Sequence, residues 1–192
     1  GEDELPVAVA AGTTSPFDWS PDGRVILYGL GFGRGRDIWG VTVQGERRMF
    51  PVLATPFNET SAQFSPDGQW IAYQSDESGS VEIYVQRYPV GRKVRISTDG
   101  GIQVRWRRDG REMFYIAPDN RLVAVPIRLD ASRESIDVGR PVPLFTTQLA
   151  GEPRDSSGRH YMVSPDGQRF LLDTLTEVAL PLTVILNWNP GS

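Results

Sequence analysis

The chain has no cysteine, and its only histidine is His160. The lack of cysteine excludes disulfides, thiolate zinc sites and cysteine nucleophiles. A single histidine makes a histidine-based metal site or proton relay improbable on composition alone. We therefore expect no metal, no cofactor and no catalytic residues.

Long apolar runs are also missing, since none approaches the roughly 20 residues of a membrane span. The start, Gly1-Glu2-Asp3-Glu4, lacks the positive region and apolar core of a signal peptide. The net charge is -4 and the isoelectric point is near 5.1. Attraction to nucleic acid or to an anionic membrane is therefore not favoured, and we expect neither a nucleic-acid partner nor direct membrane insertion.

A short repeat is the main positive signal. Ser-Pro-Asp-Gly stands at residues 20–23, 65–68 and 164–167, and Arg-Arg-Asp-Gly at 107–110, so that successive copies start 45, 42 and 57 residues apart. The first two spacings match a four-stranded propeller blade. The four turns carry Asp22 and Gly23, Asp67 and Gly68, Asp109 and Gly110, and Asp166 and Gly167.

The tetrapeptide favours a type I turn. Serine and proline suit its first two positions, glycine suits its last, and aspartate can accept a hydrogen bond from its own local backbone. We expect each turn to join the first two strands of a blade, with its glycine at positive φ. Arg107 and Arg108 replace serine and proline, so we expect the third turn to survive with less rigidity.

Strand-like segments surround every turn. An apolar residue precedes each turn, and a short apolar run follows it, rich in β-branched and aromatic residues. A third strand lies 15 residues after the glycine in the first two copies, and outer strands with edge prolines are expected near 50–53, 94–96 and 143–145. The residues before the turns are Trp19, Phe64, Trp106 and Val163, and we expect the three aromatic ones to be core or inter-blade residues.

These patterns predict an all-β fold, a β-propeller with four antiparallel blades, in one domain over residues 1–192. The blades are expected near 15–55, 60–100, 103–147 and 159–188. No segment has convincing helical periodicity, and an excursion over about 129–159 would explain the long third spacing.

The fourth repeat lacks an outer strand, whereas residues 5–10 form an orphan one. Three arrangements fit: a closed four-bladed ring, an eight-bladed ring from two chains, or half of a larger propeller. We favour the last, with a homodimer through the open edges of the isolated chain.

Arg105, Arg107 and Arg108 belong to the chain's only basic cluster, which also holds Arg111. Strand alternation places Arg105 and Arg107 on the face opposite Trp106. They either form a solvated face or channel lining, which we favour, or bind an anionic group, since guanidinium suits carboxylate and phosphate.

Other suggestive segments have simpler explanations. The glycines between 29 and 35 fit no dinucleotide motif and precede a strand, so we expect a hairpin loop. Asp155, Ser156, Ser157 and His160 resemble a triad only in composition, and a polar loop is favoured. Asp76, Glu77 and Glu82 lack calcium-binding spacing, so we expect solvated loop residues. The sequence Asn58-Glu59-Thr60 fits the N-glycosylation pattern, which matters only in a secretory host.

Two sequence runs resemble a known family. Residues 64–73 with 82–85 are similar to the TolB-like, or WD40-like, β-propeller repeat. Residues 55–60 through 106–115 and the ending 182–188 resemble the C-terminal propeller of bacterial serine/threonine protein kinases. The resemblance implies a propeller outside the membrane, in an extracytoplasmic or periplasmic location, within a membrane kinase. None of the kinase motifs is in this chain.

Two functions follow from these observations. We favour a non-catalytic recognition or sensor propeller that binds a protein, a peptide or a small molecule through loops on a rigid scaffold. The alternative is an accessory propeller that filters substrate for a peptidase or hydrolase. The ending 187–190 resembles a natural chain end, which counts against a following hydrolase domain. An enzyme with its own site in the propeller is the weakest reading.

Overall fold

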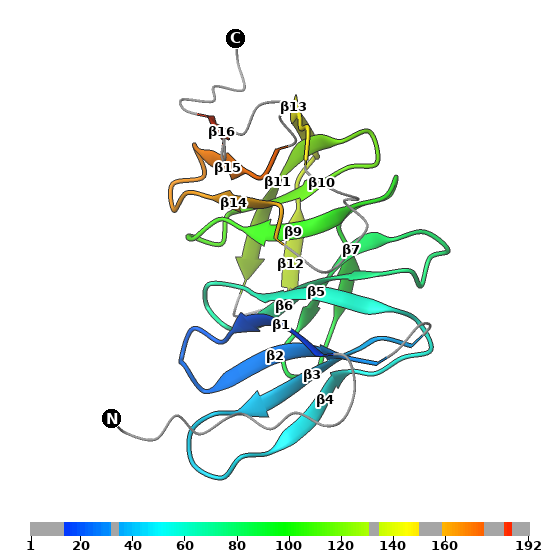
Figure 1. The fold of residues 1–192 in the computed structure, drawn as a ribbon, viewed down its shortest axis with the longest axis vertical. Helices are drawn as coiled ribbons and strands as arrows, with labels where there is room; N and C mark the ends of the chain where they lie inside the picture. Colours follow the sequence, from blue (N-terminus) through cyan, green and yellow to red (C-terminus); the bar gives the residue numbers. More distant parts are fainter. Residues whose placement is uncertain (1–13, 32–34, 131–134, 150–158, 175–182, 186–192) are drawn as a thin grey trace.

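The computed structural model describes residues 14–31, 35–130, 135–149, 159–174 and 183–185, and within these ranges the secondary structure is β only. The strands form four antiparallel sheets that follow one another along the long axis of the molecule (Figure 1). The predicted all-β propeller is therefore confirmed. In the same ranges no helix is long and apolar enough to cross a bilayer.

The sheets are numbered here as blades 1 to 4 in chain order. Blade 1 holds β1 (Thr14–Trp19), β2 (Val25–Leu30), β3 (Asp37–Thr42) and β4 (Met49–Leu53). Blade 2 holds β5 (Glu59–Phe64), β6 (Trp70–Ser75), β7 (Glu82–Arg87) and β8 (Lys93–Arg95). Blade 3 holds β9 (Ile102–Trp106), β10 (Glu112–Ile116), β11 (Arg121–Asp130), β12 (Ser135–Val138) and β13 (Val142–Thr146). Blade 4 holds β14 (Tyr161–Val163), β15 (Phe170–Leu172) and β16 (Thr183–Ile185).

The hydrophobic core consists of three layers, one between each pair of successive blades. Central strands supply both neighbouring layers because alternate side chains point to opposite faces. In β6, Trp70 and Ala72 pack toward blade 3, whereas Ile71 and Tyr73 pack toward blade 1. A strand buried on both faces reads in the sequence as a continuous apolar run. The layer between blades 3 and 4 includes Phe114, whose ring meets that of Phe170 edge to face at 5.1 Å.

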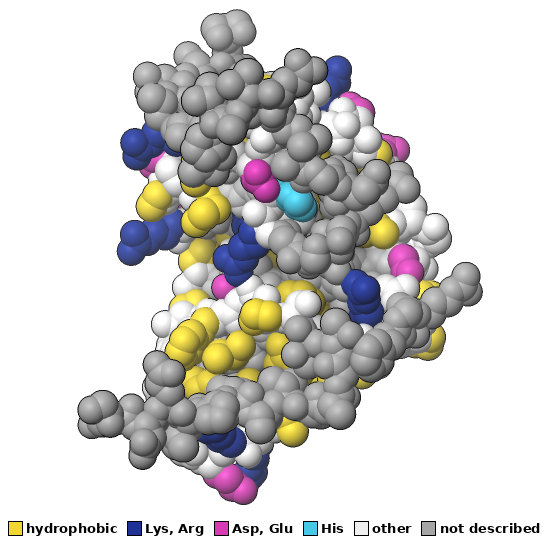
Figure 2. All heavy atoms as spheres, viewed as in Figure 1, with side chains coloured by type: hydrophobic (Ala, Val, Ile, Leu, Met, Phe, Trp, Pro, Cys, Tyr) yellow, Lys and Arg dark blue, Asp and Glu magenta, His cyan; other side chains and the backbone are white. Residues whose placement is uncertain are grey.

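Trp19 departs from its repeat position. Phe64 and Trp106 are 4% and 7% exposed, but Trp19 is 56% exposed. The expectation that Trp19 is a core or inter-blade residue is therefore wrong. The equivalent residues of blades 2 and 3 are covered by the preceding blade, and no sheet of the described residues covers this face of blade 1. On the face seen in Figure 2, hydrophobic side chains gather over the region of β1 and β2.

The predicted excursion over 129–159 begins with a strand hairpin. β11 continues to Asp130 and turns back as β12, and Ile127 and Ile136 are buried in the layer between blades 2 and 3. This β11–β12 hairpin extends the sheet of blade 3 beyond the blade proper. β13 then returns to the predicted outer position. Residues 131–134 and 150–158 lie outside the described residues, as does the predicted orphan strand 5–10, so ring closure stays a prediction.

A left-handed residue recurs in the first strands of blades 2 and 3. Ser61 and Gln103 have φ of 54° and 59°, each seven residues before the glycine of its turn, and the strand register shifts beside each. Blade 1 has Pro16 at this position, and a proline ring fixes φ near about −65°. Blade 1 therefore cannot repeat this bulge conformation. Its register shifts beside Pro16, and the Phe17 ring folds over Gly29, where an added Cβ would lie 2.7 Å from it.

Candidate functional site: a cavity at the rim between blades 2 and 3

The four Asp-Gly turns confirm the predicted geometry. Each joins the first two strands of its blade, and the glycines Gly23, Gly68, Gly110 and Gly167 have φ of 72°, 70°, 72° and 73°. In each turn, Oδ1 of the aspartate, which is Asp22, Asp67, Asp109 or Asp166, accepts a hydrogen bond from the backbone N–H two residues later. The conformation is therefore set by residues within the turn.

The third turn keeps its conformation but is held by different contacts, and its lower rigidity stays a prediction. In the other three, the serine Oγ accepts the backbone N–H five residues later, at 2.9 Å in each case. Arg107 has no hydroxyl, and its guanidinium instead pairs with Asp109 at 2.8 Å and with Glu112 at 3.4 Å. Ion pairs of a half-exposed side chain thus replace a hydrogen bond to the backbone.

The turns of successive blades touch and form a row along one rim. A Cβ added to Gly68 would lie 3.5 Å from Cδ of Pro21, and one added to Gly110 would lie 3.8 Å from Cδ of Pro66. At Gly167 the neighbour is Arg107, whose Cδ would be 2.7 Å away. Pro21 of blade 1, Pro66 of blade 2 and Arg107 of blade 3 therefore each pack on the turn glycine of the next blade.

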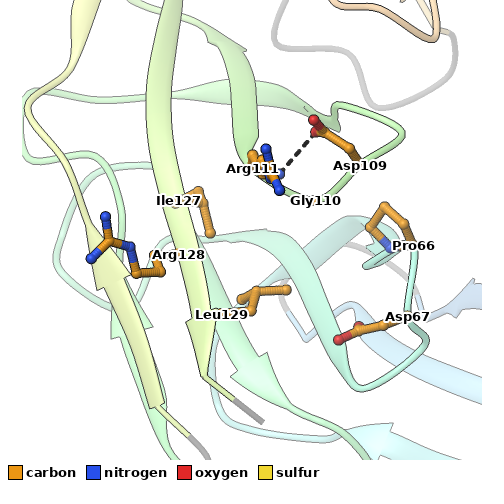
Figure 3. A pocket seen from close by; sticks show the side chains of 8 residues that line it. All are labelled: Pro66, Asp67, Asp109, Gly110, Arg111, Ile127, Arg128 and Leu129. Atoms are coloured by element: carbon orange, nitrogen blue, oxygen red, sulfur yellow. Dashed lines mark hydrogen bonds between the residues drawn. The ribbon is translucent and has the colours of Figure 1, made fainter.

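A cavity of about 820 Å³ opens in this row between blades 2 and 3. One wall is made by Pro66 and Asp67 of the blade 2 turn and by Asp109 and Gly110 of the blade 3 turn (Figure 3). The β11–β12 hairpin makes the opposite wall. Its lining residues there are Ile127, Arg128 and Leu129, with Arg111 at the end of the turn.

The hairpin wall is firmly attached to the blades. The backbone N–H of Ile127 donates to the carbonyl of Arg111 at 2.8 Å, and the side chain of Ile127 is 5% exposed. Leu129 packs against the same core and lies 3.7 Å from the Cβ position of Gly110. Because both walls are part of hydrogen-bonded sheets, the cavity is formed by the fold of blades 2 and 3 itself.

The basic cluster divides between this rim and the interior. Arg111 and Arg128 are exposed at the cavity, Arg108 is exposed in the neighbouring turn, and none of the three has an ion-pair partner among the described residues. Arg107 is paired within its turn. The structure thus brings Arg107, Arg108 and Arg111 together at one turn, whereas Arg105 is buried in the interior.

Arg105 is buried, with 9% of its surface exposed, so a solvated face is wrong for this residue, whereas a channel lining stays a prediction. Its guanidinium donates to the Val104 carbonyl at 2.7 Å and to Oε1 of Gln103 at 3.3 Å. It also lies 5.5 Å from the ring centre of Tyr161 in blade 4. Burial lowers the pKa of Arg105 from its ordinary value. Its position opposite Trp106 is confirmed, since it is paired with Phe114, which faces blade 4.

Arg105 interrupts a repeated contact between blades. Five residues before the glycine of each turn, Asp18 and Gln63 accept the backbone N–H of the next blade's Phe64 and Trp106, both at 2.9 Å. Arg105 stands at the third such position. A guanidinium has no acceptor, so the joint between blades 3 and 4 uses other contacts, including His160 N–H to Oε1 of Gln103 at 3.3 Å.

Two acidic side chains prove to be buried between blades. Glu82, expected as a solvated loop residue, is 1% exposed and accepts hydrogen bonds from Ser97 and from the Gly100 backbone. It closes the connection from blade 2 to blade 3, so the expectation is wrong for this residue. Glu59 is also 1% exposed; Thr55 and Ser75 donate to its Oε1, while its Oε2 has no hydrogen-bond partner. Burial raises the pKa of Glu59 above its ordinary value.

The other sequence candidates do not form a reactive site in the described residues. His160 lies 4.0 Å from Asp173, while Asp155, Ser156 and Ser157 lie outside the described residues. Among the residues with a described position, no three histidine or acidic side chains are placed to hold a metal ion. Gly29 lies in β2, Gly31 and Gly35 follow in the connection to β3, and Gly33 lies outside the described residues. β2 and β3 pair as a hairpin, as expected.

The sequence reasoning missed the cavity, although a signal for its wall was present. Ile127-Arg128-Leu129-Asp130 and Ser135-Ile136-Asp137-Val138 each alternate apolar and polar residues, which is the pattern of a half-buried strand. The two runs are short, and the predicted excursion over 129–159 begins within the first of them.

Comparison with solved structures places the fold. The chain superposes on TolB from Acinetobacter baumannii with a TM-score of 0.66 at 18% identity, over 91% of this chain and 41% of that protein. The fold is that of a TolB-like β-propeller. The propeller domain of the Trilobed protease from Pyrococcus furiosus gives 0.53 at 15% identity, over 93% of this chain and 55% of that one. A protein described as a candidate 6-phosphogluconolactonase from Bacteroides uniformis gives 0.54 at 14% identity, over 95% and 58%.

These likenesses concern the fold, because all three identities are low. The chain spans between 41% and 58% of the length of the three proteins. No family model matches the sequence, and no curated protein matches it either.

Proposed function

We propose that this chain is a non-catalytic recognition propeller that binds its ligand at the rim cavity between blades 2 and 3. The observation that supports this most is the β11–β12 hairpin. It departs from the repeated blade plan, and it turns a row of touching turns into an open cavity with a polar mouth and an apolar wall. Binding sites on rigid scaffolds are typically built from such departures.

The wider setting of the proposal comes from the sequence resemblance. We propose that the propeller is the extracytoplasmic, sensor part of a bacterial membrane serine/threonine kinase, as residues 55–60, 106–115 and 182–188 imply. The alternative is an accessory propeller of a peptidase, and the fold likeness to the Trilobed protease propeller is compatible with it. A gene that encodes a kinase segment and one membrane span before residue 1 supports the first, and a following hydrolase segment supports the second.

The binding proposal is tested with a displayed library of random heptapeptides selected on the immobilised chain. The double variant Arg111→Glu with Arg128→Glu reverses two charges at the cavity. The matched control, Arg92→Glu with Arg95→Glu, reverses two exposed charges at the outer edge of blade 2. We expect selected peptides to bind the control like the unaltered chain and to bind the cavity variant roughly tenfold more weakly or worse. Selected peptides that do not distinguish the two variants would contradict the proposal.

The non-catalytic part is tested separately. We expect no hydrolysis of peptides or esters, no phosphoryl transfer and no zinc binding by the purified chain. A turnover that is lost on His160→Ala, with the circular dichroism spectrum unchanged, would show that the propeller carries a reactive site of its own.

A further inference from the structure

Arg105 carries a buried positive charge that no carboxylate of the described residues neutralises. It is 9% exposed, and its guanidinium donates to two neutral oxygens, the Val104 carbonyl at 2.7 Å and Oε1 of Gln103 at 3.3 Å. Buried charges are ordinarily paired, because the loss of hydration is costly. A guanidinium has five N–H donors and no acceptor, so further donors of Arg105 remain to be satisfied at the joint between blades 3 and 4.

The other charges near Arg105 do not supply a partner. Two charged side chains act on its guanidinium, those of Arg159, which is also positive, and of Asp18 in blade 1. Oδ2 of Asp18 accepts a backbone N–H of blade 2 at 2.9 Å, and its Oδ1 lies 3.9 Å from the Arg159 guanidinium. Asp173 lies beside His160 instead, 4.0 Å from its Nδ1. Two guanidiniums therefore share one carboxylate, and this group keeps one excess positive charge.

A second observation at the same joint points to an acceptor oxygen. The ring centre of Tyr161 lies 5.5 Å from the guanidinium carbon of Arg105. Tyr161 is 1% exposed, and its hydroxyl has no hydrogen-bond partner among the described residues. Burial raises the pKa of Tyr161 above its ordinary value, so the hydroxyl keeps its proton and can donate. Buried polar groups without a partner are uncommon, and here a cation and an O–H donor both require a negatively charged acceptor.

This group of side chains is separate from the rim cavity. Arg105 in β9 faces Tyr161 in β14, whereas the cavity lies between blades 2 and 3, and neither residue lines it. The side chain of Arg159 is 53% exposed and donates to the Phe17 carbonyl of blade 1. Solvent therefore reaches the group on the side of Arg159.

We propose that Arg105, Arg159 and Tyr161 form a binding site for the carboxylate group of a small organic acid. The planar guanidinium fork of Arg105 matches the two carboxylate oxygens, the Tyr161 hydroxyl donates to one of them, and Arg159 lies at the entrance. A carboxylate brings the single negative charge that the group lacks. Because Arg105 and Tyr161 are almost fully buried, the ligand that reaches both is small. The inference goes beyond the proposed function, since this second site does not depend on the cavity.

The probe is sodium propionate, titrated into the ¹⁵N-labelled chain and compared with sodium chloride at equal ionic strength. The NMR signal of the Arg105 Nε–Hε group, assigned through Arg105→Gln, reports on the guanidinium. We expect propionate to shift this signal in a saturable manner and sodium chloride to leave it in place. Inorganic phosphate, which carries more than one negative charge at neutral pH, is expected to bind more weakly than propionate.

A pair of tyrosine variants tests the hydroxyl. Tyr161→Phe removes only the O–H, and we expect it to weaken propionate binding roughly tenfold, with an unchanged or higher urea midpoint in the absence of propionate. Tyr28→Phe is the matched control, because Tyr28 is 3% exposed in blade 1 and its hydroxyl also lacks a partner among the described residues. The control is expected to bind propionate like the unaltered chain.

Two arginine variants test the place of the site. Arg105→Gln introduces the residue type that blade 2 carries at the equivalent position, Gln63, so we expect it to fold and to lose propionate binding. The double variant Arg111→Glu with Arg128→Glu alters the rim cavity and is expected to bind propionate normally. If Arg105→Gln does not fold, the two tyrosine variants, followed through the backbone amide of Tyr161, still decide the question.

Four results overturn the inference. Equal shifts with propionate and with sodium chloride would show a response to ionic strength alone. Equal propionate binding by Tyr161→Phe and Tyr28→Phe would remove the hydroxyl from the site, and tighter binding of phosphate would refute the carboxylate class. Loss of propionate binding in the double variant would move the site to the rim. None of these results bears on the selection of peptides at the cavity, so the proposed function is tested independently.

Discussion

The repeat position before the turn provides a sharp test of how the blades are stabilised. Phe64 and Trp19 occupy equivalent positions, but Phe64 is 4% exposed and Trp19 is 56% exposed. The Phe64 ring also meets the Tyr88 ring edge to face, with 5.2 Å between the centres. Removing a buried Phe side chain costs about 3–5 kcal/mol, and the lost aromatic pair adds about 0.5–1.5 kcal/mol to this. A largely exposed side chain contributes on the order of 0.5 kcal/mol.

We therefore expect Phe64→Ala to lower the free energy of unfolding by about 3.5–6.5 kcal/mol, and Trp19→Ala to change it by less than about 1 kcal/mol. Urea unfolding followed by far-ultraviolet circular dichroism measures both, because most of this signal comes from the backbone and it remains usable when one aromatic residue is removed. Trp106→Ala serves as a second buried case, at 7% exposure. A loss on Trp19→Ala as large as that on Phe64→Ala would refute the reasoning, since it would mean that the open face of blade 1 is covered.

Three further predictions concern single residues. Burial raises the pKa of Glu59 above its ordinary value, so the folded chain keeps this proton at pH values where the unfolded chain releases it, and stability falls as pH rises from the ordinary value toward the folded one. Glu59→Gln should remove this dependence on pH and stabilise the chain at neutral pH by on the order of 1 kcal/mol. Thermal unfolding at pH 4 and pH 7 measures this. An equal effect of the substitution at both pH values would contradict the prediction. Gly101→Ala should cost about 1–3 kcal/mol, because its Cβ would lie 2.8 Å from Ser97 Oγ and 2.9 Å from Ile83 Cγ1. The calorimetric melting temperature measures this, with Val90→Ala, at a residue that is 82% exposed, as the control. Ser65→Ala should cost about 1–2 kcal/mol in urea unfolding, since it removes the acceptor of the buried Trp70 N–H, and a neutral result would show that this bond does not hold the turn.

The blades could be predicted from the sequence because their signals are local. A turn such as Ser65 to Gly68 is fixed by hydrogen bonds within a few residues, and the apolar run at Trp70 is long enough to mark a strand. Such features depend little on the rest of the chain. The fold class and the positive φ of the turn glycines followed from them.

Burial and the cavity could not be predicted in the same way, because they depend on neighbours distant in sequence. Trp19 and Phe64 have the same local pattern, and only the presence of a covering blade separates them. Arg105 follows an alternating strand pattern, but its burial comes from Gln103 and from Tyr161 of the next blade. The cavity requires the turn at Pro66 to meet a hairpin about 60 residues away, and no spacing rule in the sequence connects the two.

The contacts of Asp18 and Gln63 with the next blade have a consequence for how such a protein can grow. Blades 1 and 2 each carry an acceptor side chain, Asp18 or Gln63, and blade 2 also carries, one residue later, the backbone donor that the acceptor of blade 1 requires. A blade with both halves of this joint fits before or after any other such blade, so duplication of the gene segment yields a compatible unit at once. Arg105 removes the acceptor half from blade 3. A duplicated blade inserted after blade 3 would meet a joint that it cannot complete, whereas insertion between blades 1 and 2 would preserve every contact of this kind.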